Sequence, residues 1–250
     1  MKHRFPFHLL QRVVPYRNLD LYDADQIEVE PNVERHLWPV MRHMLKEYYA
    51  MVSSLDDQLG RIVAALDDLH LRKNTTIIYT SDHGDLVGSH STGRYRSKSL
   101  PYQNAYRVPL IIAGADIPPG TEVDTPVGSV DLLPTILDLA GLPSATDLPG
   151  RSMKVGVDGR IGSESDVVLM GLHNWRAVHD GRYCYAVFFD ADESTLLIDT
   201  ERDSYDMDNL LERFELYPAG VRLHRQLCEK LREVGDLDGL ERVPARYEFQ

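Results

Sequence analysis

The chain contains 250 residues, 43% of them hydrophobic and 26% charged, which is enough for one large core or for two unequal domains. Its 27 basic and 39 acidic residues give a formal net charge of -12. An acidic chain without a basic cluster argues against nucleic acid as a partner, whereas a small anionic substrate can still bind at a local cationic site.

No apolar run approaches the ~20 residues that a membrane-spanning helix needs. The N-terminal stretch MKHRFPFHLL is charged and has no sustained apolar core, so it does not resemble a signal peptide. The two cysteines, Cys184 and Cys228, lie far apart and in no motif, which favours free thiols over a disulfide framework. These features favour a cytoplasmic location.

Residues 1–42 contain four prolines and an acidic segment without periodicity, and we expect them to wrap the surface of a larger body. The strongest helical pattern runs from about Met44 to Leu69, where apolar residues recur with the 3.6-residue period. We therefore predict a helical segment over 43–72 and interpret its apolar stripe as core packing.

The apolar, β-branched run from Thr76 to Thr80 predicts a buried strand of a parallel sheet, and it ends in Ser-Asp82-His83-Gly84. Such sheets place their chemistry just past the carboxyl ends of strands. A carboxylate and an imidazole side by side can ligate one divalent cation, and Gly84 lets the backbone turn tightly. The alternative is that Asp82 caps a following helix and that His83 is an ordinary turn residue.

A polar loop follows Gly84, and Arg107 to Gly114 then reads as a second buried strand. Asp131 is a candidate N-cap for a helix over residues 132–140 that Gly141 ends. A Gly-, Asp- and Ser-rich stretch marks a boundary near residue 156. Beyond it, four short strands separated by turn signals predict a small antiparallel sheet, and a terminal helix covers about 221–234.

The predicted organisation is therefore a main α/β domain over 1–155 and a small α+β subdomain over 156–250. The main domain combines the irregular wrap over 1–42, the helix over 43–72, and the metal-site strand, loop and following α/β segment over 75–155.

Eight blocks in this order resemble the C-terminal part of a sulfatase, within the alkaline phosphatase superfamily. The blocks are YYAMVSSLDDQLGRI (48–62), TSDHG (80–84), GSH (88–90), RVPLII (107–112), VDLLPTILDLAGLP (130–143), LPGRS (148–152), WRAVHDGRY (175–183) and LLIDTERDSYDMDNLL (196–211). The resemblance implies an α/β fold: part of a sulfatase- or alkaline-phosphatase-like sandwich of mainly parallel sheet with helices, followed by a small antiparallel sheet and a terminal helix.

The resemblance also implies roles for individual residues. Asp82 and His83 stand where the family ligates a divalent cation beside the sulfate. Lys98 lies nine residues before Arg107, as does the family lysine that contacts the sulfate and assists the leaving group. His90 matches the family's G-x-H and either lines the site or braces the loop. His3 is a further catalytic candidate, although it lies one residue earlier than the family's H-x-P-F-like pattern requires.

Two elements of the family are missing from the sequence. The nucleophile is a cysteine or serine in C/S-x-P-S/A-x-R, oxidised to formylglycine, and neither Cys184 nor Cys228 lies in such a motif. The family's N-terminal pair of metal aspartates is also absent. Two ligands do not hold a divalent ion tightly, since calcium takes about six or more. We therefore expect a fragment, a split gene product or a truncated form with little activity alone.

The resemblance predicts metal-dependent hydrolysis of a sulfate monoester, with Ca²⁺ as the expected ion and Mn²⁺ or Zn²⁺ as alternatives. The expected partners are a small anionic ester substrate and either an N-terminal half or a second copy of the chain. One alternative is a phosphonate monoester or phosphodiester hydrolase of the same superfamily. Another is a sulfatase-like remnant without catalysis.

Overall fold

The computed structural model describes residues 15–90, 97–114, 117–143, 148–154, 167–190, 195–213 and 218–244. These residues form two compact units. The first unit lies within residues 1–75 and 87–97, and the second within 76–86 and 98–250. The predicted boundary near residue 155 does not separate these units, and it falls among residues outside the described ones.

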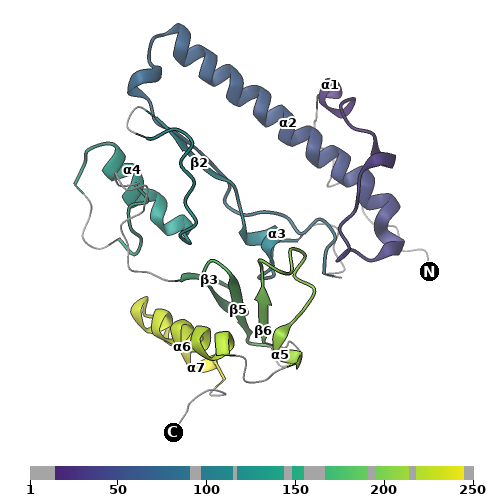
Figure 1. The fold of residues 1–250 in the computed structure, drawn as a ribbon, viewed down its shortest axis with the longest axis vertical. Helices are drawn as coiled ribbons and strands as arrows, with labels where there is room; N and C mark the ends of the chain where they lie inside the picture. Colours follow the sequence, from purple (N-terminus) through teal and green to yellow (C-terminus); the bar gives the residue numbers. More distant parts are fainter. Residues whose placement is uncertain are drawn as a thin grey trace. The chain divides into compact units, whose positions relative to one another are not determined.

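A long helix, α2, dominates the first unit and spans Trp38–Asp68 (Figure 1). It confirms the helix predicted over 43–72, but it begins five residues earlier. Pro39 lies in its first turn, where the missing N–H removes no hydrogen bond. The shorter helical segments of this unit are α1 (Tyr16–Leu19), η2 (Ala24–Gln26), η3 (Arg35–Leu37) and η4 (Arg72–Asn74).

The segment before α2 lies along this helix, as expected of a wrapping segment. The Asp57 carboxylate accepts hydrogen bonds from Asn18 at 3.1 Å and from Arg17 at 3.2 Å. One turn earlier on α2, Ser53 Oγ lies 2.6 Å from the Tyr22 hydroxyl. The apolar core of the unit is small and consists of Val29, Val33 and Met41 with their half-buried neighbours.

The prediction that the whole apolar stripe of α2 packs in a core is wrong for the middle of the helix. Met41 and Ala50 are fully buried, whereas Val52, Leu55 and Ile62 are 47%, 55% and 55% exposed. The described residues of the wrapping segment, from Pro15 onward, therefore cover only part of the stripe.

In the second unit, strand β1 (Ile77–Thr80) pairs with β2 (Leu110–Ala113) in antiparallel register, with Thr80 opposite Leu110. The expected parallel, buried strand is thus wrong on both points, since β1 is half-buried and its neighbour runs the other way. A parallel neighbour requires a crossover connection. Here the chain turns back, and the only helix described between the strands is the four-residue α3 (Gln103–Tyr106).

The predicted C-terminal sheet is confirmed. Its antiparallel order is β3-β4-β5-β6, from strands Val168–Leu172, Trp175–His179, Tyr183–Phe188 and Leu196–Asp199. The terminal helix is α6 (Pro218–Glu233), and it is flanked by α5 (Leu210–Arg213) and by α7 (Leu237–Arg242), which was not predicted.

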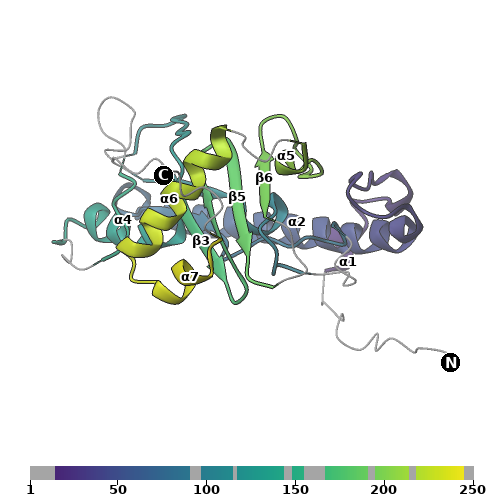
Figure 2. The ribbon, with the colours of Figure 1, turned by 90° about the horizontal axis from the view of Figure 1, so that it is seen from below.

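Both faces of this sheet are covered. Val178, Tyr185 and Val187 pack with Leu223 and Leu227 of α6 in one cluster. Alternate positions of the same strands form a second cluster with Tyr106 of α3, namely Trp175, Ala177, Cys184, Ala186 and Ile198. Figures 1 and 2 show α6 across one face of the sheet, and Figure 1 shows α3 beside the other. This two-sided burial gives the sheet its core.

Helix α4 (Leu132–Leu139) follows the turn η5 (Ser129–Asp131), and Gly141 ends it in the left-handed conformation at φ +67. Asp131 does not cap this helix through its side chain. Its carboxylate instead accepts from Gly128 N at 2.8 Å and from Arg151 N at 2.9 Å, so it ties the LPGRS segment to the turn.

Both cysteines are free thiols, as expected, and burial raises the pKa of Cys184 to about 12. No helix among the described residues is long and apolar enough to cross a membrane.

His179 is expected to make the second unit less stable in mild acid. Burial lowers its pKa below 6.5, opposed by Asp180 and assisted by Arg107, and the Tyr106 ring lies 5.7 Å away. Its Nδ1 accepts from Gly181 N at 2.9 Å, so a proton there would face another donor. The unfolded chain therefore binds a proton that the folded chain does not, and stability falls as the pH drops from 6.5 towards the lowered pKa.

Urea unfolding at several pH values between 5 and 8 measures this effect. The His179→Asn variant should lose the slope in this interval, whereas the exposed residue His70 at the end of α2 offers the matched control His70→Asn. Asp180 and Asp199 have pKa values below the ordinary value of 3.8, so protonation of these carboxylates lowers stability only in stronger acid, outside this interval. An unchanged slope in His179→Asn would contradict the assignment.

Candidate metal centre

The candidate site lies directly after β1, at Ser81-Asp82-His83-Gly84. Gly84 N donates to Ala105 O at 2.7 Å, which fixes the turn against α3. A Cβ on Gly84 would lie 2.0 Å from Asn104 O, so the backbone of α3 occupies the space that any side chain would need. The glycine is therefore required by close packing.

Asp82 is exposed and ionised. Its Oδ1 accepts from His83 N at 2.9 Å, and this hydrogen bond is the main cause of a lowered pKa, to which the Lys98 ammonium also contributes. No helix begins in the described residues that directly follow Asp82, which removes the helix-capping alternative. The other oxygen, Oδ2, lies 3.5 Å from His83 Nε2.

The neighbours of His83 define which nitrogen can bind a cation. Nδ1 lies 2.8 Å from Gly84 O, and because a carbonyl only accepts, Nδ1 carries the proton. Nε2 is then the nitrogen with the lone pair. This arrangement, in which a backbone carbonyl orients a histidine ring, is common behind metal-ligating histidines.

Lys98 approaches the same nitrogen, with Nζ 2.5 Å from His83 Nε2. The lysine is exposed and lies 15 residues after His83 in sequence. The three side chains that sequence reasoning singled out at the strand end and in the loop therefore meet at one place within the second unit. Their catalytic and metal-binding roles stay predictions.

Asp82 Oδ2 and His83 Nε2 fit adjacent positions around one divalent cation. Adjacent ligands of a six-coordinate ion with bonds of about 2.4 Å lie about 3.4 Å apart, close to the observed separation of 3.5 Å. Among the described residues, however, no group of three or more His, Cys, Asp or Glu side chains gathers around a common point. The described residues thus provide two donors of suitable chemistry.

The two remaining candidates, His90 and His3, lie outside the described part of the second unit that holds this cluster. His90 belongs to the first unit, at φ +59, where its N donates to Asn32 O at 3.0 Å and its Nε2 lies 3.3 Å from Asn32 Nδ2. These contacts support the bracing role, and the site-lining role stays a prediction. His3 lies outside the described residues.

Sequence reasoning missed the groups that hold the Lys98 segment. Trp175 Nε1 donates to Ser99 O at 2.7 Å, and the buried carboxylate of Asp206 accepts from Gln103 N at 2.6 Å. The first pair is separated by 76 residues and the second by 103. No local pattern identifies partners at such separations. The one available signal was the tryptophan itself, because a buried indole N–H needs an acceptor.

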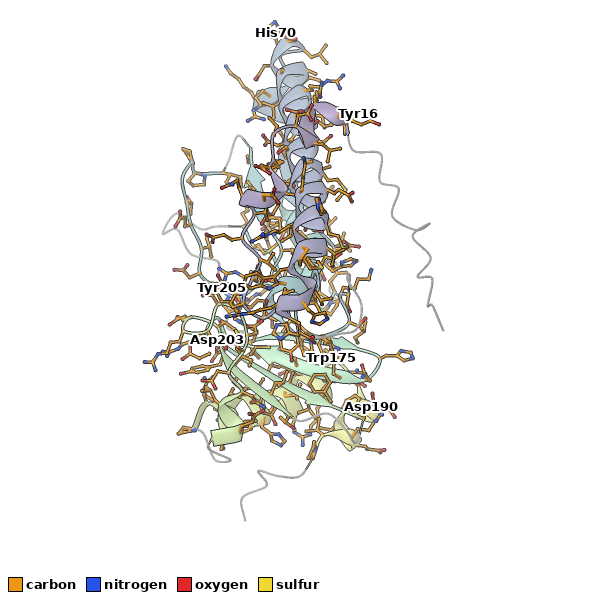
Figure 3. The ribbon with its side chains drawn as sticks, turned by 90° about the vertical axis from the view of Figure 1, so that its right-hand side faces the viewer. Tyr16, His70, Trp175, Asp190, Asp203 and Tyr205 are labelled. Carbon is orange, nitrogen blue, oxygen red and sulfur yellow. The ribbon has the colours of Figure 1, made fainter. Side chains whose placement is uncertain are left out.

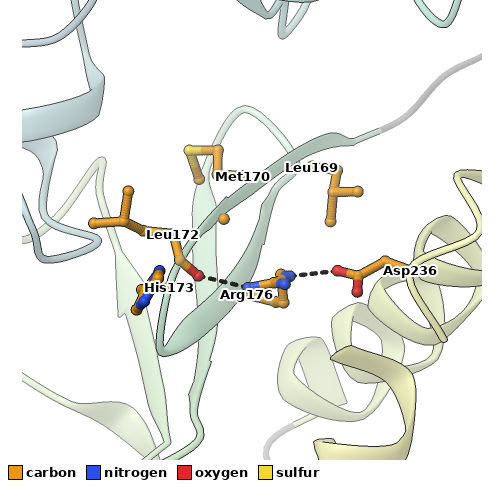
Figure 4. A pocket seen from close by; sticks show the side chains of 7 residues that line it. Leu169, Met170, Leu172, His173, Arg176 and Asp236 are labelled. Atoms are coloured by element: carbon orange, nitrogen blue, oxygen red, sulfur yellow. Dashed lines mark hydrogen bonds and ion pairs between the residues drawn. The ribbon is translucent and has the colours of Figure 1, made fainter. Parts of the chain in front are cut away.

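A hollow beside the β3–β4 hairpin contains none of the predicted site residues (Figure 4). Arg176 and Asp236 line it and form an ion pair at 2.5 Å, and Arg176 also donates to Leu172 O. The charged groups of Arg176 and Asp236 are therefore already paired within the chain.

Two family profiles match the chain. The sulfatase profile matches residues 11–142, and the profile of the C-terminal region of N-sulphoglucosamine sulphohydrolase matches residues 91–233. The chain is 27% identical to the ulvan-active sulfatase of Formosa agariphila over 241 residues, which are 92% of this chain and 47% of that protein.

Solved structures show the same fold. The yidJ structure from Bacteroides fragilis, described as a sulfatase, aligns with a TM-score of 0.77 at 24% identity, over 96% of this chain and 54% of that one. A phosphonate monoester hydrolase from Silicibacter pomeroyi aligns with a TM-score of 0.67 at 22% identity, over 86% and 46%. The likeness confirms the predicted fold class, and the chain spans about half the length of these relatives.

Proposed function

The chain belongs to the sulfatase family, and we propose that it supplies the cation-binding strand end and the cationic lysine of an enzyme that hydrolyses a sulfate monoester. The observation that carries the proposal is the meeting of Asp82, His83 and Lys98 at the end of β1. A carboxylate, an imidazole lone pair and an ammonium group at one place can hold a cation and an anionic ester together.

Each residue has a defined task in this proposal. Asp82 stays ionised through its hydrogen bond from His83 N and offers Oδ2 to the cation. His83 offers Nε2, because Gly84 O holds the proton on Nδ1. A cation bound there would neutralise sulfate oxygens and lower the pKa of the attacking group. Lys98 would offset the negative charge that develops on the leaving oxygen as the S–O bond breaks.

Calcium is the ion we propose, with manganese or zinc as alternatives. An exposed carboxylate suits a hard cation that completes its shell with further oxygen ligands. Zinc favours fewer ligands and more nitrogen or sulfur, and manganese lies between the two.

We also propose that a different polypeptide segment, an N-terminal half, supplies the nucleophile and the remaining cation ligands. The sequence contains no C/S-x-P-S/A-x-R motif. A second copy of this chain would bring the same residues again and so could not supply that motif. The substrate is a small anionic ester, and nucleic acid is not a proposed partner because of the net charge of -12.

An assay of the 250-residue chain with 4-nitrophenyl sulfate and with a 4-nitrophenyl phosphonate monoester, each with calcium, tests the proposal. We expect little turnover from this chain alone, and preferential sulfate hydrolysis from a form that also carries the nucleophile segment. Preference for the phosphonate would support the phosphonate hydrolase alternative. Robust turnover by this chain alone would contradict the assignment of the nucleophile to another segment.

Calcium binding separates the enzyme proposal from a remnant without a site. Ligand binding to the folded state raises stability by about 2.7 kcal/mol at a concentration one hundred times the Kd. We therefore expect added calcium to raise the melting temperature of a form that also carries the nucleophile segment, and not that of its Asp82→Ala variant. A melting temperature indifferent to calcium, manganese and zinc would favour the non-catalytic alternative.

A further inference from the structure

The segment that carries Lys98 is attached to the C-terminal sheet. Three backbone groups of this segment contact side chains of the second unit: Ser99 O accepts from Trp175 Nε1 at 2.7 Å, Pro101 O lies 3.8 Å from Cys184 Sγ, and Gln103 N donates to Asp206 Oδ2 at 2.6 Å. The contact to Ser99 is the nearest of the three to Lys98 along the chain, at the adjacent residue.

Trp175 is itself held firmly. It is the first residue of β4, pairs in register with Leu172 of β3 and Phe188 of β5, and is 5% exposed. Figure 3 shows Trp175 on the C-terminal sheet. Its ring packs in the cluster on the face away from α6. The position of its indole N–H is therefore set by the sheet rather than by the loop.

Lys98, by contrast, has an exposed side chain with many rotamers, so packing does little to orient it. Its ammonium nevertheless lies 2.5 Å from His83 Nε2. A long side chain reaches one partner reproducibly only if its own backbone is fixed, and the carbonyl of the next residue is the group that Trp175 fixes.

We propose that Trp175 is a positioning residue for Lys98: its indole N–H holds the Ser99 carbonyl and so aims the Lys98 ammonium at the strand-end site. The C-terminal sheet thereby takes part in building a site at the end of β1, to which it contributes no ligand. The catalytic role of Lys98 rests on the proposed function, whereas its contact with His83 does not.

The variant Trp175→Phe tests this inference because it keeps an aromatic ring and removes the donor. The chain contains a matched control, since Trp38 Nε1 donates in the same way to Val33 O at 3.0 Å within the first unit. Trp38→Phe removes an equivalent bond that has no connection to the Lys98 segment.

The first readout is the rate at which an amine-reactive reagent labels Lys98, followed by mass spectrometry and compared with the exposed Lys73 in each protein. We expect Trp175→Phe to raise the Lys98 rate about fivefold, the shift expected from losing a single hydrogen bond, and Trp38→Phe to leave it unchanged. This measurement needs neither cation nor activity. Equal rates in the wild type and Trp175→Phe would overturn the inference.

The second readout is a double-mutant cycle on calcium affinity. If Trp175 acts through Lys98, Trp175→Phe changes the affinity of a form that also carries the nucleophile segment and has no further effect in a Lys98→Ala background. An equal effect in both backgrounds would assign Trp175 a general structural role and overturn the inference. Absence of calcium binding in a form that also carries the nucleophile segment would instead count against the proposed function, and the labelling result would still decide the role of Trp175.

Discussion

Lys98→Ala is expected to tighten calcium binding and to slow sulfate ester hydrolysis, two effects of opposite sign. In the structure, Lys98 Nζ lies 2.5 Å from His83 Nε2, so the ammonium and a cation compete for one lone pair. The lysine also places a like charge beside the ion. Removing it should strengthen calcium binding about 5- to 10-fold at low ionic strength, and less at high salt.

Hydrolysis should respond in the other direction. A positioned charge that stabilises a developing anion is typically worth about 10²- to 10³-fold in rate, and we expect Lys98→Ala to lose that much in a form that carries the nucleophile. The loss should grow as the leaving group becomes more basic, because a basic leaving oxygen needs more charge compensation. Calorimetry with calcium and kinetics with a series of aryl sulfates, both on a form that carries the nucleophile segment, measure the two effects.

Lys73→Ala is the matched control, since Lys73 is an exposed lysine of η4 in the first unit. It should change neither measurement. Lys98→Arg keeps the charge and should recover part of the rate. If Lys98→Ala instead weakened calcium binding, Lys98 would be part of the cation's support, and the competition inferred from the contact with His83 would be wrong.

The local sequence was sufficient to predict the strand-end pair and the C-terminal sheet. The apolar run before Asp82 marked the strand, and alternating residues from Trp175 to Ile198 marked the strands whose two faces are now seen to be covered. Lys98 was identified through the family resemblance, in which a lysine lies nine residues before the arginine that stands here as Arg107. In each instance, the determining pattern lies within a few residues of the feature it predicts.

What the sequence could not show depends on partners far away in the chain. The antiparallel pairing of β1 with β2 depends on how a 29-residue connection returns, from Ser81 to Pro109, and neither strand encodes its neighbour's direction. Asp131 stands where an N-cap is expected, but its carboxylate is drawn to Arg151 N, 20 residues later. The hydrogen bond from Trp175 to Ser99 likewise joins residues that are far apart in the sequence.

Gly84→Ala is expected to abolish most of the cation binding while leaving the C-terminal sheet folded. The added Cβ would lie 2.0 Å from Asn104 O and 3.0 Å from Asn104 C, and both atoms belong to backbone that cannot rotate away. Helix α3 is in turn anchored through Gln103 to Asp206, so the turn after β1 must yield.

Displacing that turn breaks the hydrogen bond from Gly84 N to Ala105 O and moves the carbonyl that orients His83. We expect calcium affinity to fall at least about tenfold, and the free energy of unfolding to fall by about 1–3 kcal/mol, as overpacking usually costs. Calorimetry and urea unfolding measure these changes, and the fluorescence of Trp175 in a Trp38→Phe background reports whether the sheet stays intact.

Gly60→Ala is the matched control, because the same substitution is expected to raise stability at this position. No described atom lies within 4 Å of a Cβ at Gly60, in the interior of α2, so alanine should stabilise the helix by about 0.5–1 kcal/mol without changing calcium affinity. If Gly84→Ala bound calcium as tightly as Gly60→Ala, the strand-end turn would tolerate displacement. The geometry of Asp82 and His83 could then not be what determines the cation site.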